Sequence, residues 1–99
     1  MRPDKKIKVL KNRIRENHKD YKAYIAIGDI YQQYGNFNGA IQAYQRALKI
    51  KPKDEINLNR LGEAFWRAKR YPEALGQFKK ALKVNPKYAY AHLNLGKAF

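Results

Sequence analysis

Apolar residues recur along this chain at steps of three and four positions, which is the period of an amphipathic helix. One such run contains Ala40, Ile41, Tyr44, Ala47 and Leu48. The alternation of apolar and polar residues that favours a strand is absent from the pattern. The runs predict six helices at about residues 4–18, 21–34, 38–50, 55–68, 72–84 and 89–99.

The helical pattern repeats with a period of about 34 residues, which is typical of solenoid proteins. Pro86 takes the place of Pro52 in the next copy, and the segments 40–54 and 74–88 align without a gap. Each full copy contains two helices. A chain of 99 residues can form one array of this kind, because each unit buries its faces against its neighbours.

Residues suited to helix ends stand between the runs. Asp20 and Asp54 precede the first helix of each copy, where an aspartate side chain can cap free amide groups. Gly35 follows a first helix, where a left-handed conformation is favoured. Pro72 can open a second helix, because a proline in the first turn loses no helical hydrogen bond.

Together, the spaced residues resemble the tetratricopeptide repeat family, over residues 6–99. The family signature runs aromatic, Leu-Gly, aromatic, alanine, aromatic, alanine and proline. The matching residues are Tyr24, Ile27, Gly28, Tyr31, Ala40, Tyr44, Ala47 and Pro52 in the first full copy, and Leu58, Leu61, Gly62, Phe65, Ala74, Phe78, Ala81 and Pro86 in the second.

The resemblance implies an all-α, right-handed superhelical array of antiparallel helix pairs. It divides residues 1–99, taken as one array, into a lone second helix at 4–20, full repeats at 21–54 and 55–88, and a lone first helix at 89–99. Solenoids need polar capping surfaces. We therefore expect either a fragment of a longer array or a homo-oligomer joined through open ends that include Leu95 and Phe99.

The resemblance also implies a concave groove, lined by the first helices, that holds a peptide segment of another protein. The residues expected in it are Ile25, Asp29, Asn59, Glu63, Trp66, Arg67 and Tyr90. Asp29 and Glu63 would receive basic groups, and Trp66 would anchor an apolar side chain. Alternatively, Trp66 packs against the neighbouring first helix as part of the groove wall.

Charge adds an alternative function. The chain has 22 Lys and Arg against 8 Asp and Glu, a net charge of +14, which favours anionic partners. The cations gather on second helices and the loops after them, and the basic outer face is represented by Lys49, Lys79, Lys80 and Lys83. This face could bind nucleic acid or anionic lipid through counterion release, or its lysines could serve only to solvate an outer surface.

Other classes of protein are disfavoured. A hydrophobic content of 44% argues against disorder, and no apolar run is long enough to cross a membrane. The absence of cysteines and of a recognisable signal peptide leaves the compartment open, and we take a cytoplasmic location as the expectation. His18 and His92 are expected far apart, and no phosphate-binding loop or nucleophile motif is present. We expect no enzymatic activity, no metal and no cofactor.

Overall fold

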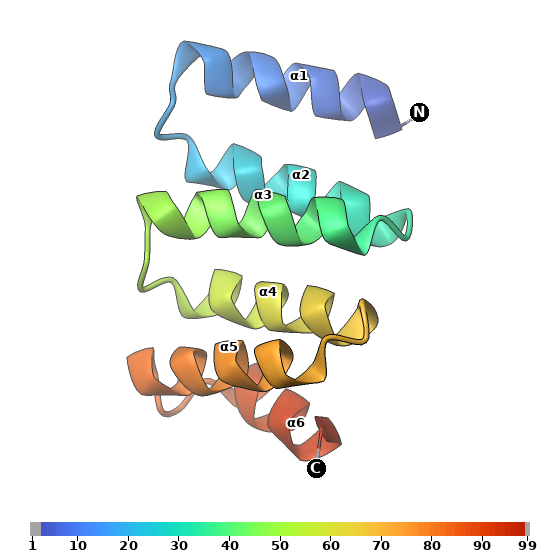
Figure 1. The fold of residues 1–99 in the computed structure, drawn as a ribbon. Coiled ribbons are helices and arrows are strands. Elements are labelled where there is room, and N and C mark those ends of the chain that lie inside the picture. The colour runs from blue at the N-terminus through green and yellow to red at the C-terminus, as the bar shows by residue number, and fades with distance from the viewer. Residues whose placement is uncertain (1–2, 99) are drawn as a thin grey trace.

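The computed structural model describes residues 3–98 and is all-α (Figure 1). Its helices are α1 (Pro3–Glu16), α2 (Tyr21–Gln33), α3 (Phe37–Ile50), α4 (Glu55–Arg67), α5 (Tyr71–Val84) and α6 (Ala89–Ala98). The predicted fold class is confirmed, and the predicted helix ends differ from these bounds by at most two residues. Phe99, expected at an open end, lies outside the described residues, and Leu95 is half-buried against the core.

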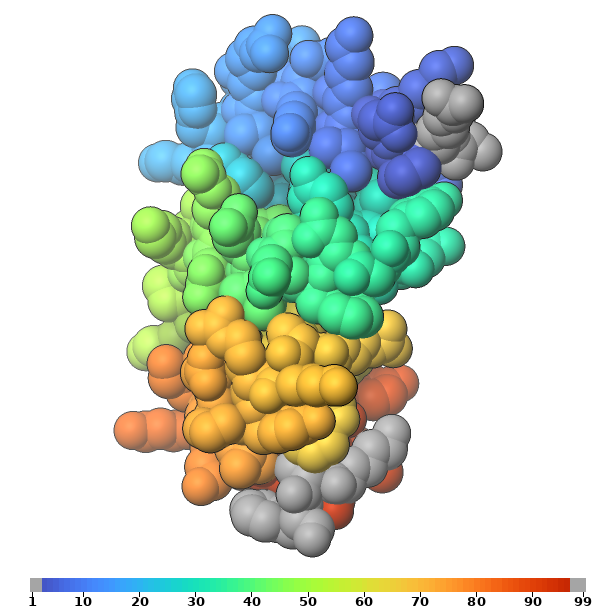
Figure 2. Space-filling model, turned by 45° about the vertical axis from the view of Figure 1, so that its right-hand side comes forward, coloured from blue at the N-terminus to red at the C-terminus, as the bar shows by residue number. Residues whose placement is uncertain are grey.

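The helices stack in chain order, with α1 and α6 at opposite ends (Figure 1). The space-filling view shows the same order as successive bands of colour (Figure 2). Helix α2 packs against α3, and α4 packs against α5, while α3 contacts α4. The described part of the chain therefore has an elongated shape, measuring 38 × 25 × 18 Å.

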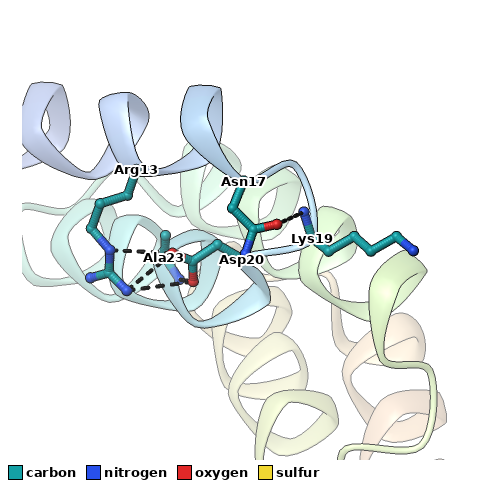
Figure 3. A network of polar contacts seen from close by, with 5 residues as sticks. All are labelled: Arg13, Asn17, Lys19, Asp20 and Ala23. Atoms are coloured by element: carbon teal, nitrogen blue, oxygen red, sulfur yellow. Dashed lines mark hydrogen bonds and ion pairs between the residues drawn. The ribbon is translucent and has the colours of Figure 1, made fainter.

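Aspartates cap the first helix of each full repeat, as the sequence predicts. Asp20 Oδ1 accepts a hydrogen bond from the Ala23 amide at 3.1 Å, and Asp54 Oδ1 accepts one from the Ile56 amide at 3.1 Å. Arg13 of α1 also pairs with Asp20, at 3.1 Å (Figure 3). The same carboxylate thus caps α2 and fixes α1 against its start.

The turn between the two helices of a repeat needs a left-handed residue. Gly35 supplies it in the first repeat, with φ +83°, and Lys69 holds the equivalent place in the second, with φ +63°. In both turns the following amide closes the helix end, Asn36 N onto Tyr31 O and Arg70 N onto Phe65 O, each at 2.8 Å. Lysine carries no sequence signal for this conformation, so only Gly35 could be predicted.

An aromatic ring on a glycine holds the two helices of each repeat together. Tyr44 covers Gly28, and Phe78 covers Gly62. A methyl group on Gly28 would come to 2.5 Å from Tyr44 Cε1, and one on Gly62 would come to 2.6 Å from Phe78 Cδ1. Both rings are fully buried and belong to a core that joins α3, α4 and α5. The glycines therefore set the distance between paired helices.

Replacing Gly62 tests this contact. Gly62→Ala should lower the free energy of unfolding by about 1–3 kcal/mol, because the added methyl group overpacks the core against Phe78. Gly76→Ala is the matched control: nothing lies within 4 Å of its added methyl group, and alanine should stabilise α5 by about 0.5–1 kcal/mol. Urea denaturation measures both. Equal effects of the two substitutions would contradict the packing argument.

Replacing Lys69 tests the backbone strain in the second turn. Lys69→Gly should raise the free energy of unfolding by about 0.5–1 kcal/mol, because glycine adopts positive φ without a steric penalty. Lys87→Gly removes the same charge from a turn in which the backbone φ is not positive, so it should give no gain. A thermal melt followed by circular dichroism separates the two outcomes.

Candidate functional site

A hollow of about 470 Å³ lies on the first helices and is called here the first-helix groove. It is lined by Asp29, Gln32, Tyr44, Ile56, Asn59, Arg60, Glu63, Tyr88 and Tyr90. Four residues predicted for the site, Asp29, Asn59, Glu63 and Tyr90, thus lie in one hollow. Helices α2 and α4 supply most of the lining, and Tyr44 of α3, Tyr88 just before α6 and Tyr90 in α6 complete it.

Two more predicted residues line an adjoining hollow. Trp66 and Arg67 border it together with Glu63, Phe78 and Asn94, and Glu63 belongs to both linings. The seventh predicted residue, Ile25, is half-buried and packs against the core. The two hollows therefore meet at Glu63, and Ile25 lines neither of them.

The carboxylate of Asp29 is occupied within the chain. It accepts a hydrogen bond of 2.5 Å from the Tyr44 hydroxyl and forms an ion pair with Arg60 of the next repeat. Side-chain exposures of 43% for Asp29 and 40% for Arg60 place this pair at the groove surface rather than in the core. An exposed pair of this kind contributes little to stability by itself, so its main effect is to orient both groups.

The carboxylate of Glu63 is occupied in a related way. It accepts hydrogen bonds from the side-chain amides of Asn59 at 2.9 Å and Asn94 at 3.3 Å. Asn94 also donates to Asn59 Oδ1 at 2.8 Å, and Asn59 is only 3% exposed. Asn59 is therefore a buried link in this network and offers a ligand little surface.

Both networks occupy the same place in consecutive repeats. Glu63 stands one full repeat after Asp29, and Asn94 stands one full repeat after Arg60. In each case an acid contacts a side chain of the following first helix. The acids assigned to a ligand's basic groups thus connect successive first helices. In the sequence, the signal for this arrangement is that both the acid and a polar partner recur 34 residues later.

Trp66 is 37% exposed and packs edge-to-face with Tyr71, with ring centroids 4.5 Å apart. Tyr71 is the first residue of α5, so the contact braces the indole against the partner helix of its own repeat. The partly exposed indole lines the same hollow as Arg67. Tyr90, 65% exposed, and Ile56, 48% exposed, add further apolar surface along the groove.

Sequence reasoning did not place Tyr44 or Tyr88 in the first-helix groove. Helical register alone places Gln32 and Ile56 along the groove, and it places neither Tyr88 nor the core residue Tyr44 there. The Gln32 Oε1 atom is buried and has no hydrogen-bond partner among the described residues. Tyr88 follows the closing Pro86 in a turn, so helical register could not assign it to a face.

The residues of the basic outer face lie elsewhere. Lys49, Lys79, Lys80 and Lys83 are all exposed, on α3 and α5. Lys80 and Lys83 line a separate hollow of about 420 Å³ with Lys53, over an apolar floor that includes Leu58 and Val84. Within residues 3–98 the ion pairs are Arg13–Asp20, Arg60–Asp29 and Arg70–Glu73, so none of these lysines is paired there.

The described residues contain no group of three or more His, Cys, Asp or Glu side chains that could hold a metal ion. Among the six described helices, none combines the length and apolar character that a membrane crossing requires. The lining of the first-helix groove offers hydrogen bonding, charge and apolar contact.

Comparison with known proteins agrees with the helical fold and with the 34-residue repeat. A family model described as TPR repeat matches residues 28–69 and 67–99. No curated protein matches the chain significantly.

Several solved structures have the same fold. The first TPR of Spaghetti (RPAP3), bound to the HSP90 peptide SRMEEVD, is 17% identical with a TM-score of 0.90 over 97% of this chain and 76% of that one. The Arabidopsis OM64 TPR domain is 23% identical with a TM-score of 0.87, over 93% and 76%. The MamA protein is 32% identical with a TM-score of 0.77 over 84% of this chain, which spans 45% of that protein's chain.

The Tyr44 hydroxyl gives the network a pH dependence. Burial raises the pKa of this hydroxyl, and the hydrogen bond to Asp29 raises it further. The same tyrosine in the unfolded chain ionises near pH 10. Because the folded form keeps the proton above that pH, the contribution of Tyr44 to stability is present below about pH 10 and falls as the pH rises beyond it.

Tyr44→Phe tests this dependence. The phenyl ring should still cover Gly28, as Phe78 covers Gly62, while loss of the hydrogen bond should lower the free energy of unfolding at pH 7 by about 1–2 kcal/mol. Denaturation between pH 8 and 11 should show a shallower alkaline decline for the variant than for the wild type. Tyr90→Phe, at an exposed site, should keep the wild-type decline; identical slopes for all three proteins would contradict the assignment.

Proposed function

The chain belongs to the TPR repeat family, a family of protein–protein interaction modules, and from this premise we propose that it is a non-catalytic scaffold whose first-helix groove binds a peptide segment of a partner protein. Full repeats at residues 21–54 and 55–88, flanked by a second helix at 4–20 and a first helix at 89–99, would present this groove. An array of the same fold is known with a peptide bound, which supports the choice of ligand.

The observation that carries this proposal is the internal pairing of the groove acids. Asp29 and Glu63 already accept hydrogen bonds from their own chain. The groups left to meet a ligand are Arg67 and the remaining N–H donors of Arg60, whose side chain is 40% exposed. We therefore assign hydrogen bonds to peptide carbonyls or carboxylates to these arginines, while Asp29 holds Arg60 in position.

Apolar surface next to the arginines would provide an anchor. The partly exposed indole of Trp66 lines the same hollow as Arg67, and Tyr90 and Ile56 extend the apolar surface along the groove. Tryptophan and arginine are the residues most enriched among energetically dominant interface contacts. A peptide with one large apolar side chain near carboxylate or carbonyl groups fits this arrangement.

Trp66→Ala tests the proposal. Peptides selected from a random display library against the wild-type chain would be titrated into both proteins by calorimetry. We expect the substitution to weaken binding by more than about 1 kcal/mol, or about fivefold, with unchanged helicity. Because Trp66 is the only tryptophan, its fluorescence in the wild type should also change on binding.

The matched control is charge reversal of Lys79, Lys80 and Lys83, which lie on α5 outside the first-helix groove. This variant should bind the selected peptides within about threefold of the wild type at physiological salt, since surface charges act only over about a Debye length. Unaltered affinity in Trp66→Ala, together with loss of binding in the lysine variant, would move the interaction to the basic outer face.

A further inference from the structure

Another hollow, of about 330 Å³, opens between α1, α2 and α3 and is called here the α1–α3 hollow. It shares no lining residue with the first-helix groove. Its floor is apolar: Ile27 and Ala43 are buried, and Ile14, Tyr24 and Tyr31 are half-buried. A hollow of this size over apolar side chains falls within the range of ligand-binding cavities.

Two cations stand at the rim of the hollow. Lys11 extends from α1 and Arg46 from α3, so the charges come from different helices. Both are exposed, and neither belongs to an ion pair within residues 3–98. No Asp or Glu lines the hollow. Its field is therefore positive, with no carboxylate in the lining to offset it.

Small residues on α3 create the space. Gly39 and Ala43 face the hollow, and Glu73 and Gln77 stand at the equivalent positions of the next repeat. Lys11 likewise corresponds to Gln45. The second repeat boundary thus lacks both the small residues and one of the cations. The α1–α3 hollow therefore differs from the hollow at the second boundary, in which Leu58 and Lys80 hold the positions of Tyr24 and Arg46.

We propose that the α1–α3 hollow is a second binding site, which takes an acidic peptide segment of a partner by inserting one large apolar side chain between Lys11 and Arg46. The apolar floor would receive the side chain, and the two cations would pair with carboxylates on either side of it. The array would then hold two protein segments at once, one at the first-helix groove and one at this hollow. This inference does not depend on the function proposed for the groove.

The lining favours a peptide over the other anions. Single-stranded nucleic acid needs successive exposed rings on which bases can stack, and here Tyr24 and Tyr31 are half-buried below the rim of one hollow. A lipid surface needs a continuous exposed apolar face rather than a bounded hollow. A free phosphate would make no use of the apolar floor.

The test is a fluorescence-polarisation titration with a short, blocked, dye-labelled peptide of aspartate and glutamate around a central leucine and phenylalanine. At physiological salt, the double variant Lys11→Glu, Arg46→Glu should bind it at least about tenfold more weakly than the wild type. The double variant Arg15→Glu, Lys49→Glu makes the same charge change on the same two helices outside the lining, and should lose no more than about threefold.

Filling the hollow tests its shape independently of its charge. Ala43→Leu should weaken binding of the same peptide at least about fivefold, because the added side chain occupies the site of the inserted one. Circular dichroism checks that each variant is folded; if Ala43→Leu is not, the paired charge variants still decide the question. The peptide with leucine and phenylalanine replaced by serine should bind as weakly as the filled variant.

Three results would overturn the proposal. Equal losses of peptide affinity in the two charge variants would show that the peptide is attracted only by the general positive field of the surface. Competition by oligo-deoxythymidine or by phosphatidylserine vesicles as effective as that by unlabelled peptide would show a site for polyanions in general. Loss of binding in Trp66→Ala, with none in the hollow variants, would place the peptide in the first-helix groove, leaving the proposed function intact.

Discussion

The contact of an aromatic ring with a glycine backbone is the constraint on which the rest of this structure depends. Tyr44 on Gly28 and Phe78 on Gly62 fix how closely two antiparallel helices approach. With that distance set, Ala40 can pack with no exposed surface between the pair. The first helix of each repeat then turns one face to its partner and leaves the other free to line a groove.

Tyr44 connects this core to the groove. Its ring packs on Gly28, while its hydroxyl donates to Asp29, which in turn orients Arg60 of the next repeat. One side chain thus determines both the spacing within a repeat and the position of a groove cation. Phe78 has no hydroxyl, and in its repeat Glu63 is held by amide groups instead. Packing is therefore the same in the two repeats, but the polar surface that it supports differs.

The features that could be predicted from the sequence are those that depend on residues close together in the chain. The helices and the caps at Asp20 and Asp54 depend on local spacing and local hydrogen bonds. The pattern of residue types was therefore sufficient to predict them. The pairing of Asp29 with Arg60 was not predicted, because it depends on how successive repeats are placed against each other. The left-handed conformation of Lys69 was not predicted, because the turn imposes it on a residue type that does not favour it.

The two links between successive first helices differ in kind. Asp29 and Arg60 form an ion pair at the surface, and mobile ions weaken such a pair. Asn94 reaches Asn59 and Glu63 through amide hydrogen bonds, one of them to a buried partner, which dissolved salt affects much less. Ionic strength therefore loosens the joint between α2 and α4 more than the joint between α4 and α6. Salt therefore affects the orientation of Arg60 in the groove more than that of Asn94.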